Sequence, residues 1–304
     1  MKKILALILA LCMVFALCAC GNEKTPDPTK SPDTTDTPAT TEPTAAPAET
    51  EEPDVAVVIE TVTPGVLTVA TSPDFAPYEF YALDEEGTPT LAGFDMDLAK
   101  YIADYLGLEL EVIPMDFDGT IMELAAGKVD LGMAGYSPDP ERADKMDFSD
   151  IYITGGQSFV CLQSNKDQFT SLEDTNKADY TIGAQVGSIQ AGLAKENSPD
   201  ADIIELAKVT DIIAELLTGK MDGAYIETMV AEAYAKNYPD LCIVLDVPYD
   251  AEGSVVGVNK GNTALLEGVN AAIEACQSSG EFDKYVVTAI EQAQGDIIEG
   301  LIEG

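Results

Sequence analysis

Histidine and tryptophan are absent from the 304-residue sequence, and Arg142 is its single arginine. Without histidine, the sequence excludes Ser-His-Asp and Cys-His catalytic centres and histidine-ligated metal sites. The 16 basic residues stand against 54 acidic residues, which gives a formal net charge of −38. A chain this acidic lacks the clustered Lys and Arg that bind nucleic acid and anionic lipid headgroups. We therefore expect no nucleic-acid partner, no metal and no cofactor.

The first twenty residues have the pattern of a secretory signal peptide. Two lysines precede an uncharged apolar run at 4–19, which is too short and too close to the N-terminus for a permanent membrane-spanning helix. The run ends in LCACG at 17–21, which resembles the bacterial lipobox. This resemblance implies a signal peptide at 1–19 and a palmitate-type lipid anchor on Cys20, at the extracytoplasmic face of the bacterial cytoplasmic membrane. An ordinary secretory signal that is cleaved elsewhere is the alternative.

Residues 20–54 differ sharply in composition from the rest of the chain. From 21 to 54 there are seven prolines and nine threonines, with almost no aliphatic side chains. Such a segment buries too little apolar surface to offset the entropy of ordering it. We expect a disordered, extended tether here rather than a binding motif.

Three cysteines lie beyond the signal, Cys161, Cys242 and Cys276, and no pair of them has the spacing of a metal site. Cys161 and Cys242 both lie in strand-like runs, which leaves a disulfide between them as one alternative. We favour buried free thiols, because free cysteine behaves as a small hydrophobic residue.

Residues 55–304 alternate short β-branched runs with helical patterns, and their length indicates two lobes rather than one domain. Strands are expected at 66–70, 110–113, 129–134, 180–184, 202–206, 222–226, 241–245 and 255–258. One amphipathic helix is expected to end at Gly107, and others to cover 120–126, 263–277 and 282–292. The alternation predicts an α/β fold with mainly parallel sheets, flanking helices and a cleft at the carboxyl ends of the strands.

The single arginine follows the end of a predicted strand. In GMAGYSPDPERADKMDFS at 132–149, the strand ends at Gly135, and a polar turn then carries Ser137 and Arg142. A guanidinium at this place can bind a carboxylate through two parallel charge-assisted hydrogen bonds. A surface arginine paired with one of the many acids is the alternative. We favour the binding role, because the chain uses lysine at every other basic position.

Two further segments place polar groups at strand ends. In AQVGSIQ at 184–190, a glycine turn leads into a helix, so that the first helical amides and the Ser188 hydroxyl form an anion site. Glu227 directly follows the strand expected at 222–226, where a carboxylate suits an ammonium group. For Glu227, helix capping is an equally good alternative. For the turn at Ser188, the equally good alternative is an ordinary helix start, because Gly-Ser is common there.

Two aromatic residues also follow strands. Phe75 in SPDFAPYEF and Phe117 in PMDFDGT lie in polar turns where a large ring has no evident core partner. Two such rings can enclose a side chain between them, although core packing is the alternative for each. Together these groups accommodate a carboxylate, an ammonium group and a side chain, which is the chemistry of a free amino acid.

Several ordered blocks between 61 and 292 are similar to one protein family. They are VLTVATSPDFAPYEF, LAGFDMDLAKYIADYLG, VIPMDFDGTIMELAAGKVDLGMAG, PERADKMDFSDIY, IGAQVGSIQ and GKMDGAYIE. In these blocks the chain resembles the solute-binding proteins of polar amino-acid ABC importers, the bacterial extracellular solute-binding protein family 3. The resemblance implies a two-lobed periplasmic-binding-protein-like fold with a two-strand hinge. It places lobe 1 at 55–155 plus 251–304 and lobe 2 at 156–250.

The resemblance also implies roles for the matched residues of the two strand ends. Arg142 would bind the α-carboxylate of the ligand, with Ser137 assisting. The Gly135 carbonyl would accept a hydrogen bond from the α-ammonium group, and Glu227 would bind the same group. Tyr136 stands where an aliphatic residue is common in the family. We therefore expect its larger side chain to make the ligand pocket narrower.

The remaining matched residues come from the aromatic pair and the lobe 2 turn. Phe75 and Phe117 match the two rings of the family. Ser188 and Ile189 match the turn, where Ile189 replaces a more usual threonine and can donate only its amide. Ser72 stands where several binders of basic amino acids carry aspartate, which weakens the case for a dedicated basic ligand.

The resemblance implies extracytoplasmic binding of a free amino acid between the lobes and its delivery to an ABC transporter permease. The protein is expected to be a monomer, to touch the membrane only through its lipid anchor and not to be an enzyme. An acidic ligand lacks a counter-ion, which leaves neutral polar and basic amino acids open. A dehydratase-like enzyme on the same scaffold and an extracellular amino-acid sensor are the alternatives.

Overall fold

The computed structural model describes residues 59–84, 86–250 and 253–294 of the chain. The signal peptide expected at 1–19, the lipidation expected at Cys20 and the tether expected at 20–54 lie outside the described residues. None of the helices within these described ranges is long and apolar enough to cross a membrane.

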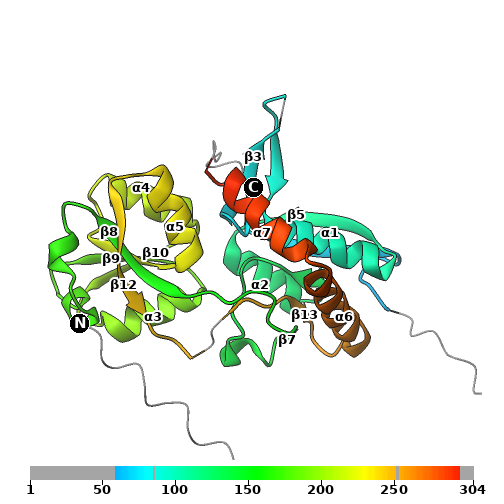
Figure 1. Ribbon diagram of the computed structural model, residues 1–304. Coiled ribbons are helices and arrows are strands. Elements are labelled where there is room, and N and C mark those ends of the chain that lie inside the picture. The colour runs from blue at the N-terminus through cyan, green and yellow to red at the C-terminus, as the bar shows by residue number, and fades with distance from the viewer. Residues whose placement is uncertain (1–58, 85, 251–252, 295–304) are drawn as a thin grey trace, which may run out of the picture. The chain divides into compact units, whose positions relative to one another are not determined.

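The first lobe is built on a five-stranded sheet in the order β5-β1-β6-β13-β7. β1 pairs in parallel with β5 and β6, and β13 pairs antiparallel with β6 and β7. The strands are β1 (Val66–Thr71), β5 (Glu109–Pro114), β6 (Leu131–Gly132), β7 (Met146–Phe148) and β13 (Gly257–Asn259). The helices, shown in Figure 1, are α1 (Phe94–Leu106), α2 (Phe117–Ala125), α6 (Thr263–Ser279) and α7 (Glu281–Gln292). The first helix of this lobe packs against its last two.

A small antiparallel sheet precedes α1 and consists of β2 (Asp74–Phe75), β3 (Glu79–Leu83) and β4 (Pro89–Ala92). Gly93 ends this sheet with a φ of +115°, and a side chain there would clash with the Tyr78 carbonyl. The amides of Phe94 and Asp95 donate to the carbonyls of Pro77 and Tyr78, which ties the small sheet to the start of α1. The sequence patterns did not predict this sheet, because its strands are short.

The second lobe is built on a five-stranded sheet in the order β10-β9-β11-β8-β12. β9 pairs in parallel with β10 and β11, whereas β8 pairs antiparallel with β11 and β12. The strands are β8 (Gln157–Leu162), β9 (Thr181–Gln185), β10 (Asp202–Leu206), β11 (Gly223–Glu227) and β12 (Leu241–Val247). The strands β9, β10 and β11 are each followed by a helix: α3 (Ile189–Asn197), α4 (Val209–Leu217) and α5 (Thr228–Asn237).

The chain passes between the two sheets twice, from β7 to β8 and from β12 to β13 (Figure 1). Ile153 and Ser254, one on each connection, form an isolated antiparallel bridge. The predicted two-lobed α/β fold is therefore confirmed, and the crossings lie where the two-strand hinge is expected. The residue limits of the lobes, 55–155 plus 251–304 and 156–250, stay predictions.

The prediction of mainly parallel sheets is wrong, since each of the two five-stranded sheets has two parallel and two antiparallel pairings. In these two sheets every antiparallel pair includes a strand next to a crossing, β7, β8, β12 or β13, because these strands run against the strands of the βα units. The strand expected at 129–134 is also shorter than predicted, since the observed strand β6 contains only Leu131–Gly132.

The three cysteines in the described part of the chain are free, which confirms the thiol expectation. Cys161 and Cys276 are buried, whereas Cys242 is partly exposed. Cys161 and Cys242 lie opposite each other on β8 and β12, with 3.9 Å between their Sγ atoms.

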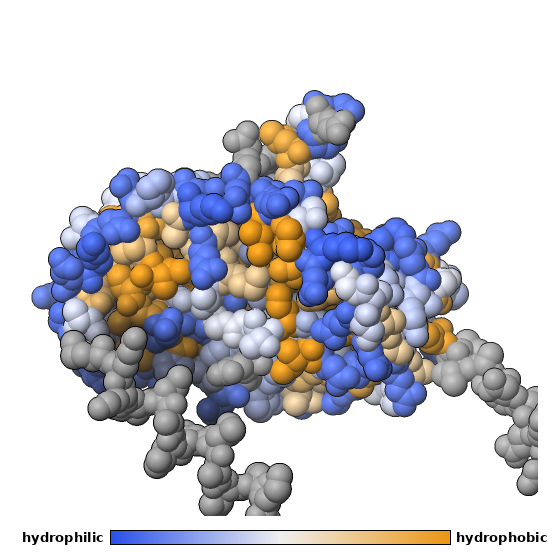
Figure 2. Space-filling view, in the orientation of Figure 1, coloured by the Kyte–Doolittle hydropathy of each residue, from blue (hydrophilic) through white to orange (hydrophobic). Residues whose placement is uncertain are grey.

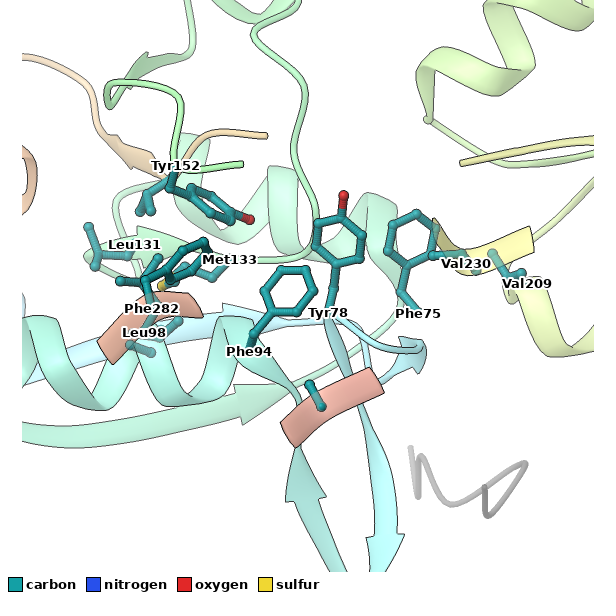
Figure 3. Packing of buried hydrophobic residues seen from close by; sticks show 14 of the residues in the cluster. Phe75, Tyr78, Phe94, Leu98, Leu131, Met133, Tyr152, Val209, Val230 and Phe282 are labelled. Atoms are coloured by element: carbon teal, nitrogen blue, oxygen red, sulfur yellow. The ribbon is translucent and has the colours of Figure 1, made fainter. Parts of the chain in front are cut away.

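Aromatic residues connect the cores of the two lobes. Figure 3 shows the rings of Phe94, Tyr78 and Phe75 in a row, with Phe75 next to Val209 and Val230 of the second lobe. The ring centroids are 4.4 Å apart for Phe94 and Tyr78, and 5.4 Å apart for Tyr78 and Phe75. A row of rings thus leads from α1 to the first turns of α4 and α5.

Helix α7 covers the first lobe with one face only. It buries Phe282 and Ala289, whereas Val287 and Ile290 are 57% and 38% exposed. Figure 2 shows hydrophobic residues gathered in a band on the face where α7 runs.

Tyr136 packs into the first lobe rather than into a pocket, which contradicts the expectation that it narrows one. It is fully buried, and its hydroxyl donates to Thr120 Oγ1 at 2.5 Å. A Cβ at Gly132 or Gly257 would lie 2.6 or 2.8 Å from its ring. The ring therefore fits only because Gly132 on β6 and Gly257 on β13 have no side chain.

We predict that Gly257→Ala destabilises the protein by about 1–3 kcal/mol, because the added methyl overpacks the Tyr136 ring. Urea unfolding followed by circular dichroism measures the change. Gly192→Ala is the control, since Gly192 lies within α3 with no atom within 4 Å of the added methyl. It should stabilise the protein by about 0.5–1 kcal/mol. Equal effects of the two substitutions would contradict the packing argument.

Candidate functional site

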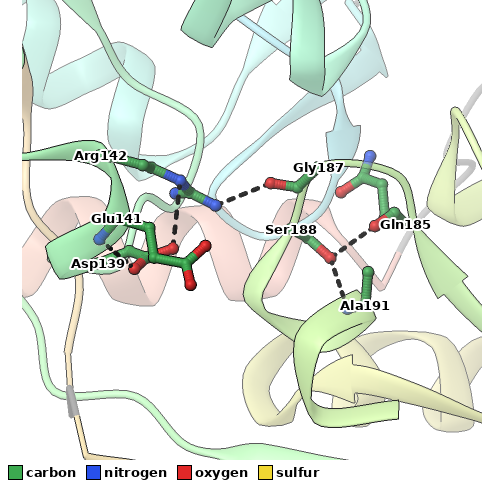
Figure 4. A network of polar contacts seen from close by, with 7 residues as sticks. All are labelled: Asp139, Glu141, Arg142, Gln185, Gly187, Ser188 and Ala191. Atoms are coloured by element: carbon green, nitrogen blue, oxygen red, sulfur yellow. Dashed lines mark hydrogen bonds and ion pairs between the residues drawn. The ribbon is translucent and has the colours of Figure 1, made fainter. Parts of the chain in front are cut away.

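Arg142 ends a short 3-10 helix, Pro140–Arg142, that follows the polar turn after β6. Asp139 caps this helix by accepting a hydrogen bond from the Glu141 amide at 2.9 Å. Arg142 is only 5% exposed, and its Nη2 donates to the carbonyl of Gly187 in the second lobe at 2.8 Å (Figure 4). Its Nε lies 3.7 Å from Asp139 Oδ2. The guanidinium thus lies between the two lobes with one loose carboxylate partner.

Two aromatic rings support the guanidinium. Arg142 Cζ lies 5.6 Å from the ring centroid of Phe117 and 6.0 Å from that of Tyr136. Burial lowers the pKa of Arg142 while the nearby Asp139 acts in the opposite direction, and an arginine stays charged at neutral pH. The contact with the rings orients the planar group, which prepares it to bind a carboxylate through two of its N–H groups.

The turn before α3 faces Arg142 from the second lobe. Ser188 is the N-cap of α3: its Oγ accepts from the Ala191 amide at 3.2 Å and donates to the Gln185 carbonyl at 2.7 Å. The Ser188 hydroxyl therefore caps α3, as at an ordinary helix start. The amide of Ile189, the first residue of α3, is among those that have no partner within a helix.

A groove of about 770 Å³ brings three of the predicted site residues together: Arg142, Ser188 and Ile189. Six acidic residues and two lysines also line it: Asp118, Asp139, Glu141, Glu196, Glu205, Asp250, Lys145 and Lys195. A small molecule in this groove would meet one buried guanidinium, the start of α3 and an excess of carboxylates.

Glu227 caps a helix, which was one of the two alternatives for it, while its role in binding an ammonium group stays a prediction. It is the last residue of β11 and the N-cap of α5, where its Oε2 accepts from the Val230 amide at 2.9 Å. Its Oε1 is buried and has no hydrogen-bond partner among the described residues. Burial raises the pKa of Glu227 to about 7, although the Val230 amide and the Tyr78 hydroxyl lower it. One carboxylate oxygen stays available, but Glu227 does not line the groove beside Arg142.

The two predicted aromatic residues are core residues, which corrects the expectation that their rings lack core partners. Phe75 and Phe117 are each 7% exposed and belong to different clusters of buried side chains. Phe75 packs against Tyr78, and Phe117 meets the Tyr136 ring edge to face at 5.7 Å. The reason is that β2 and the first turn of α2 lie against buried strand ends rather than at the surface.

The Gly135 backbone is held close to Phe75. Its φ is +57°, and a Cβ there would lie 2.7 Å from the Phe75 ring, so only glycine fits without strain. Its amide donates to Asp95 Oδ2 at 3.1 Å. Ser137 is buried two residues later, and its carbonyl accepts from the Asp139 amide.

Sequence reasoning missed Asp74, which lies next to Phe75 and is 5% exposed. Asp74 Oδ1 accepts from Ser72 Oγ at 2.8 Å, and Oδ2 accepts from the Val209 amide at 2.5 Å and from Gln185 Nε2 at 3.3 Å. Burial raises the pKa of Asp74 to about 6. The available signal was that Asp74 and Glu79 are the two charged residues of the run TVATSPDFAPYEF at 68–80.

No group of three or more His, Cys, Asp or Glu in the described residues is placed to hold a metal ion. The site therefore consists of hydrogen-bonding groups and rings: one guanidinium, helix-start amides, and carboxylates with raised pKa values.

A sequence profile described as bacterial extracellular solute-binding proteins, family 3, matches residues 67–290. The arginine-binding extracellular protein ArtP of Bacillus subtilis is 32% identical over 289 residues, which is 93% of this chain and 96% of ArtP. Cyclohexadienyl dehydratase of Pseudomonas aeruginosa is 30% identical over 180 residues, 59% of this chain and 66% of that protein. The crystal structure of the amino acid ABC transporter substrate-binding protein AbpA of Streptococcus pneumoniae, bound to L-arginine, has a TM-score of 0.73 and 34% identity, covering 76% of this chain and 97% of that one.

We predict that stability depends on pH through Glu227. Its folded pKa of about 7 exceeds the ordinary 4.5, so the folded protein binds its proton more tightly than the unfolded chain does. The contribution is complete below about pH 4.5 and is lost as pH rises to about 7. Glu227→Gln does not undergo this loss. The difference in free energy of unfolding, variant minus wild type, should therefore be about 2–4 kcal/mol higher at pH 8 than at pH 4.5.

Urea titrations at both pH values measure this difference. Glu232→Gln, which changes an exposed acid on the same helix α5, is the matched control and should show no such change between the two pH values. A Glu227→Gln curve parallel to wild type at both pH values would contradict the raised pKa.

Proposed function

Because the chain belongs to the bacterial extracellular solute-binding proteins of family 3, we propose that it binds a free amino acid outside the cytoplasm and delivers it to an ABC transporter permease. The observation that carries this proposal is the buried Arg142 guanidinium beside a groove between the lobes. The two relatives matched over nearly their full length, ArtP and AbpA, are binding proteins, whereas the dehydratase match covers 66% of that protein. Binding without turnover is therefore the function we favour over an enzyme or a sensor.

The α-carboxylate of the ligand would bind to Arg142. The guanidinium is already oriented by Phe117 and by the Gly187 carbonyl, so little freedom is lost when the ligand binds. The Ile189 amide at the start of α3 would add a donor from the second lobe. The Ser188 hydroxyl already caps α3, so it would support the turn rather than bind the ligand directly.

The α-ammonium group would bind to the carbonyl of Gly135 and to the free oxygen of Glu227. The Glu227 Oε1 atom is a buried acceptor without a partner in the described part of the chain, and a cation beside it would stabilise the ionised form. Phe75 lies directly against Gly135 and would form one wall, with Ser72 and Ser137 close to the same strand ends. Phe117 would form the other wall under Arg142.

We propose a basic amino acid as the ligand, with L-arginine as the first candidate. ArtP is named an arginine-binding protein, and AbpA is bound to L-arginine. The groove is lined by six carboxylates against three cations, Arg142 and two lysines, and this excess of acids suits a ligand with a cationic side chain. Neutral polar amino acids remain the second candidates, and the Ser72 position favours them.

We further propose that ligand binding shifts the lobes toward their closed arrangement, which the permease recognises. The protein would act as a monomer whose residues 1–19 are removed and whose Cys20 carries the lipid anchor at the extracytoplasmic face of the membrane. An extracellular family and the lipobox-like sequence support this placement.

The identity of the ligand is tested by a thermal-shift screen of the twenty amino acids with ornithine and cystine. We expect L-arginine and ornithine to raise the melting temperature most and aspartate and glutamate to have no effect. Mass spectrometry of the recovered ligand checks for turnover. A chemically altered ligand would favour the enzyme, and no shift with any amino acid would contradict the proposed function.

The site is tested by Arg142→Ala in calorimetry with L-arginine. The loss of a buried partner of the ligand carboxylate should weaken binding by about 2–5 kcal/mol. Lys145→Ala, an exposed cation that lines the same groove, is the matched control and should change binding by less than about 1 kcal/mol. Undiminished affinity of Arg142→Ala would remove Arg142 from the site.

A further inference from the structure

The three helices of the second lobe differ in how their first amides are satisfied. Ser188 caps α3 and Glu227 caps α5, each through its own side chain. At the same place before α4 stands Lys208, and its side chain makes no capping hydrogen bond. Lysine has no acceptor atom, so the first amides of α4 depend on an acceptor from elsewhere.

Asp74 of the first lobe supplies that acceptor. Its Oδ2 accepts from the amide of Val209, the first residue of α4, and also from the side chain of Gln185 at the end of β9. Its Oδ1 is held by the Ser72 hydroxyl. A carboxylate at a helix start makes a charge-assisted hydrogen bond and interacts favourably with the helix dipole.

The residues around Asp74 dock on the same two helices. Tyr234 of α5 donates its hydroxyl to the Asp74 carbonyl at 3.3 Å. The Phe75 ring lies next to Val209 and Val230, at the starts of α4 and α5 (Figure 3). This segment of β2 therefore forms a contact between the lobes that is polar at Asp74 and apolar at Phe75.

Asp74 is separate from the groove beside Arg142, whose lining residues do not include it. Burial of its charge is unfavourable in itself, as the raised pKa of the carboxyl shows. The bonds from Val209 and Ser72 act in the opposite direction. The bonds to Val209 and Gln185 exist only while the lobes are together, so they favour that arrangement over a separated one.

We propose that Asp74 is a positioning residue for ligand capture, which caps α4 across the lobe interface and thereby slows the opening of the lobes around the ligand. This inference rests on the proposed function and adds a residue that acts without touching the ligand. Because the bond holds the lobes in their joined arrangement, its loss is expected mainly in the dissociation rate constant, with the association rate constant nearly unchanged.

The bond can be removed from either side. Asp74→Ala removes the acceptor, and Val209→Pro removes the donor at a first helical position, where proline is tolerated. Lys208 already has φ −120° and ψ 139°, the conformation that a residue before proline adopts. Asp74→Asn keeps an acceptor oxygen and is the conservative rescue variant.

Surface plasmon resonance with L-arginine as the probe measures both rate constants. We expect Asp74→Ala and Val209→Pro each to raise the dissociation rate constant about 10- to 100-fold. Asp74→Asn should stay within about threefold of wild type, as should the association rate constants of all variants. The double variant should dissociate no faster than Asp74→Ala, because the bond that Val209→Pro removes is already absent in Asp74→Ala. Multiplicative losses in the double variant, or a wild-type rate for Asp74→Ala, would overturn the inference.

Amide hydrogen exchange without ligand tests the bond independently of the ligand. In Asp74→Ala, the Val209 amide should exchange at least about tenfold faster, while the amides of Ala191 and Val230, which are capped within their own lobe, stay unchanged. Equal Val209 exchange in wild type and Asp74→Ala would overturn the inference even if Asp74→Ala binds weakly through misfolding. If wild type does not bind L-arginine while the exchange result holds, the proposed ligand fails and the cap across the lobes stands.

Discussion

The starts of three helices determine how the two lobes of this protein meet. α3, α4 and α5 follow neighbouring strands of one sheet, and the first amides of every helix lack partners inside it. Ser188 and Glu227 satisfy two of these starts from within the second lobe, whereas Asp74 satisfies the third from the first lobe. The Gly187 carbonyl, just before α3, accepts from Arg142. The backbone amides and carbonyls at this edge of the sheet thus require hydrogen-bond partners, and two of these partners, Asp74 and Arg142, come from the first lobe.

Two buried acids of the first lobe, Asp74 and Asp95, are held by amides and hydroxyls rather than by basic residues. Asp95 accepts from the Tyr152 hydroxyl at 2.7 Å and from the Gly135 amide, and Asp74 accepts from Ser72 and Val209. Burial raises the pKa of both to about 6, and that of Glu79, beside Asp95, well above its ordinary value. Asp74 and Asp95 therefore make no ion pair with Arg142, and the Arg142 guanidinium lies at the groove.

The proposed site is therefore distributed over groups with different roles. Arg142 and the free oxygen of Glu227 are the charged groups that we propose for the ligand, while Phe117 and Tyr136 lie against the guanidinium. Asp74 and Phe75 hold the lobes against each other. Affinity in such a protein depends on the second set as well as on the first, because a ligand held between two lobes leaves only when they part.

Local patterns in the sequence were enough to predict the elements that depend on near neighbours. The spacing of apolar residues in α1 predicts its buried face, and Gly107 ends it in the left-handed conformation. The alternation of strands and helices predicts the two α/β lobes, and the strand end before Arg142 predicts a guanidinium at a cleft. The same patterns could not predict the antiparallel pairings at the crossings. The direction of a strand relative to its neighbour depends on the path of the chain between them, and these neighbours are far apart in the sequence.

The sequence by itself determined which groups were available: one arginine, no histidine, and polar residues at the ends of regular strands. Only the tertiary structure decided which of them meet. Asp74 and Val209 are 135 positions apart, and no local pattern in the chain indicates that they meet. Phe75 and Phe117 were expected at open turns and became core residues for the same reason. Burial and hydrogen-bond partners are set by the packing of distant segments, which local propensity and spacing do not encode.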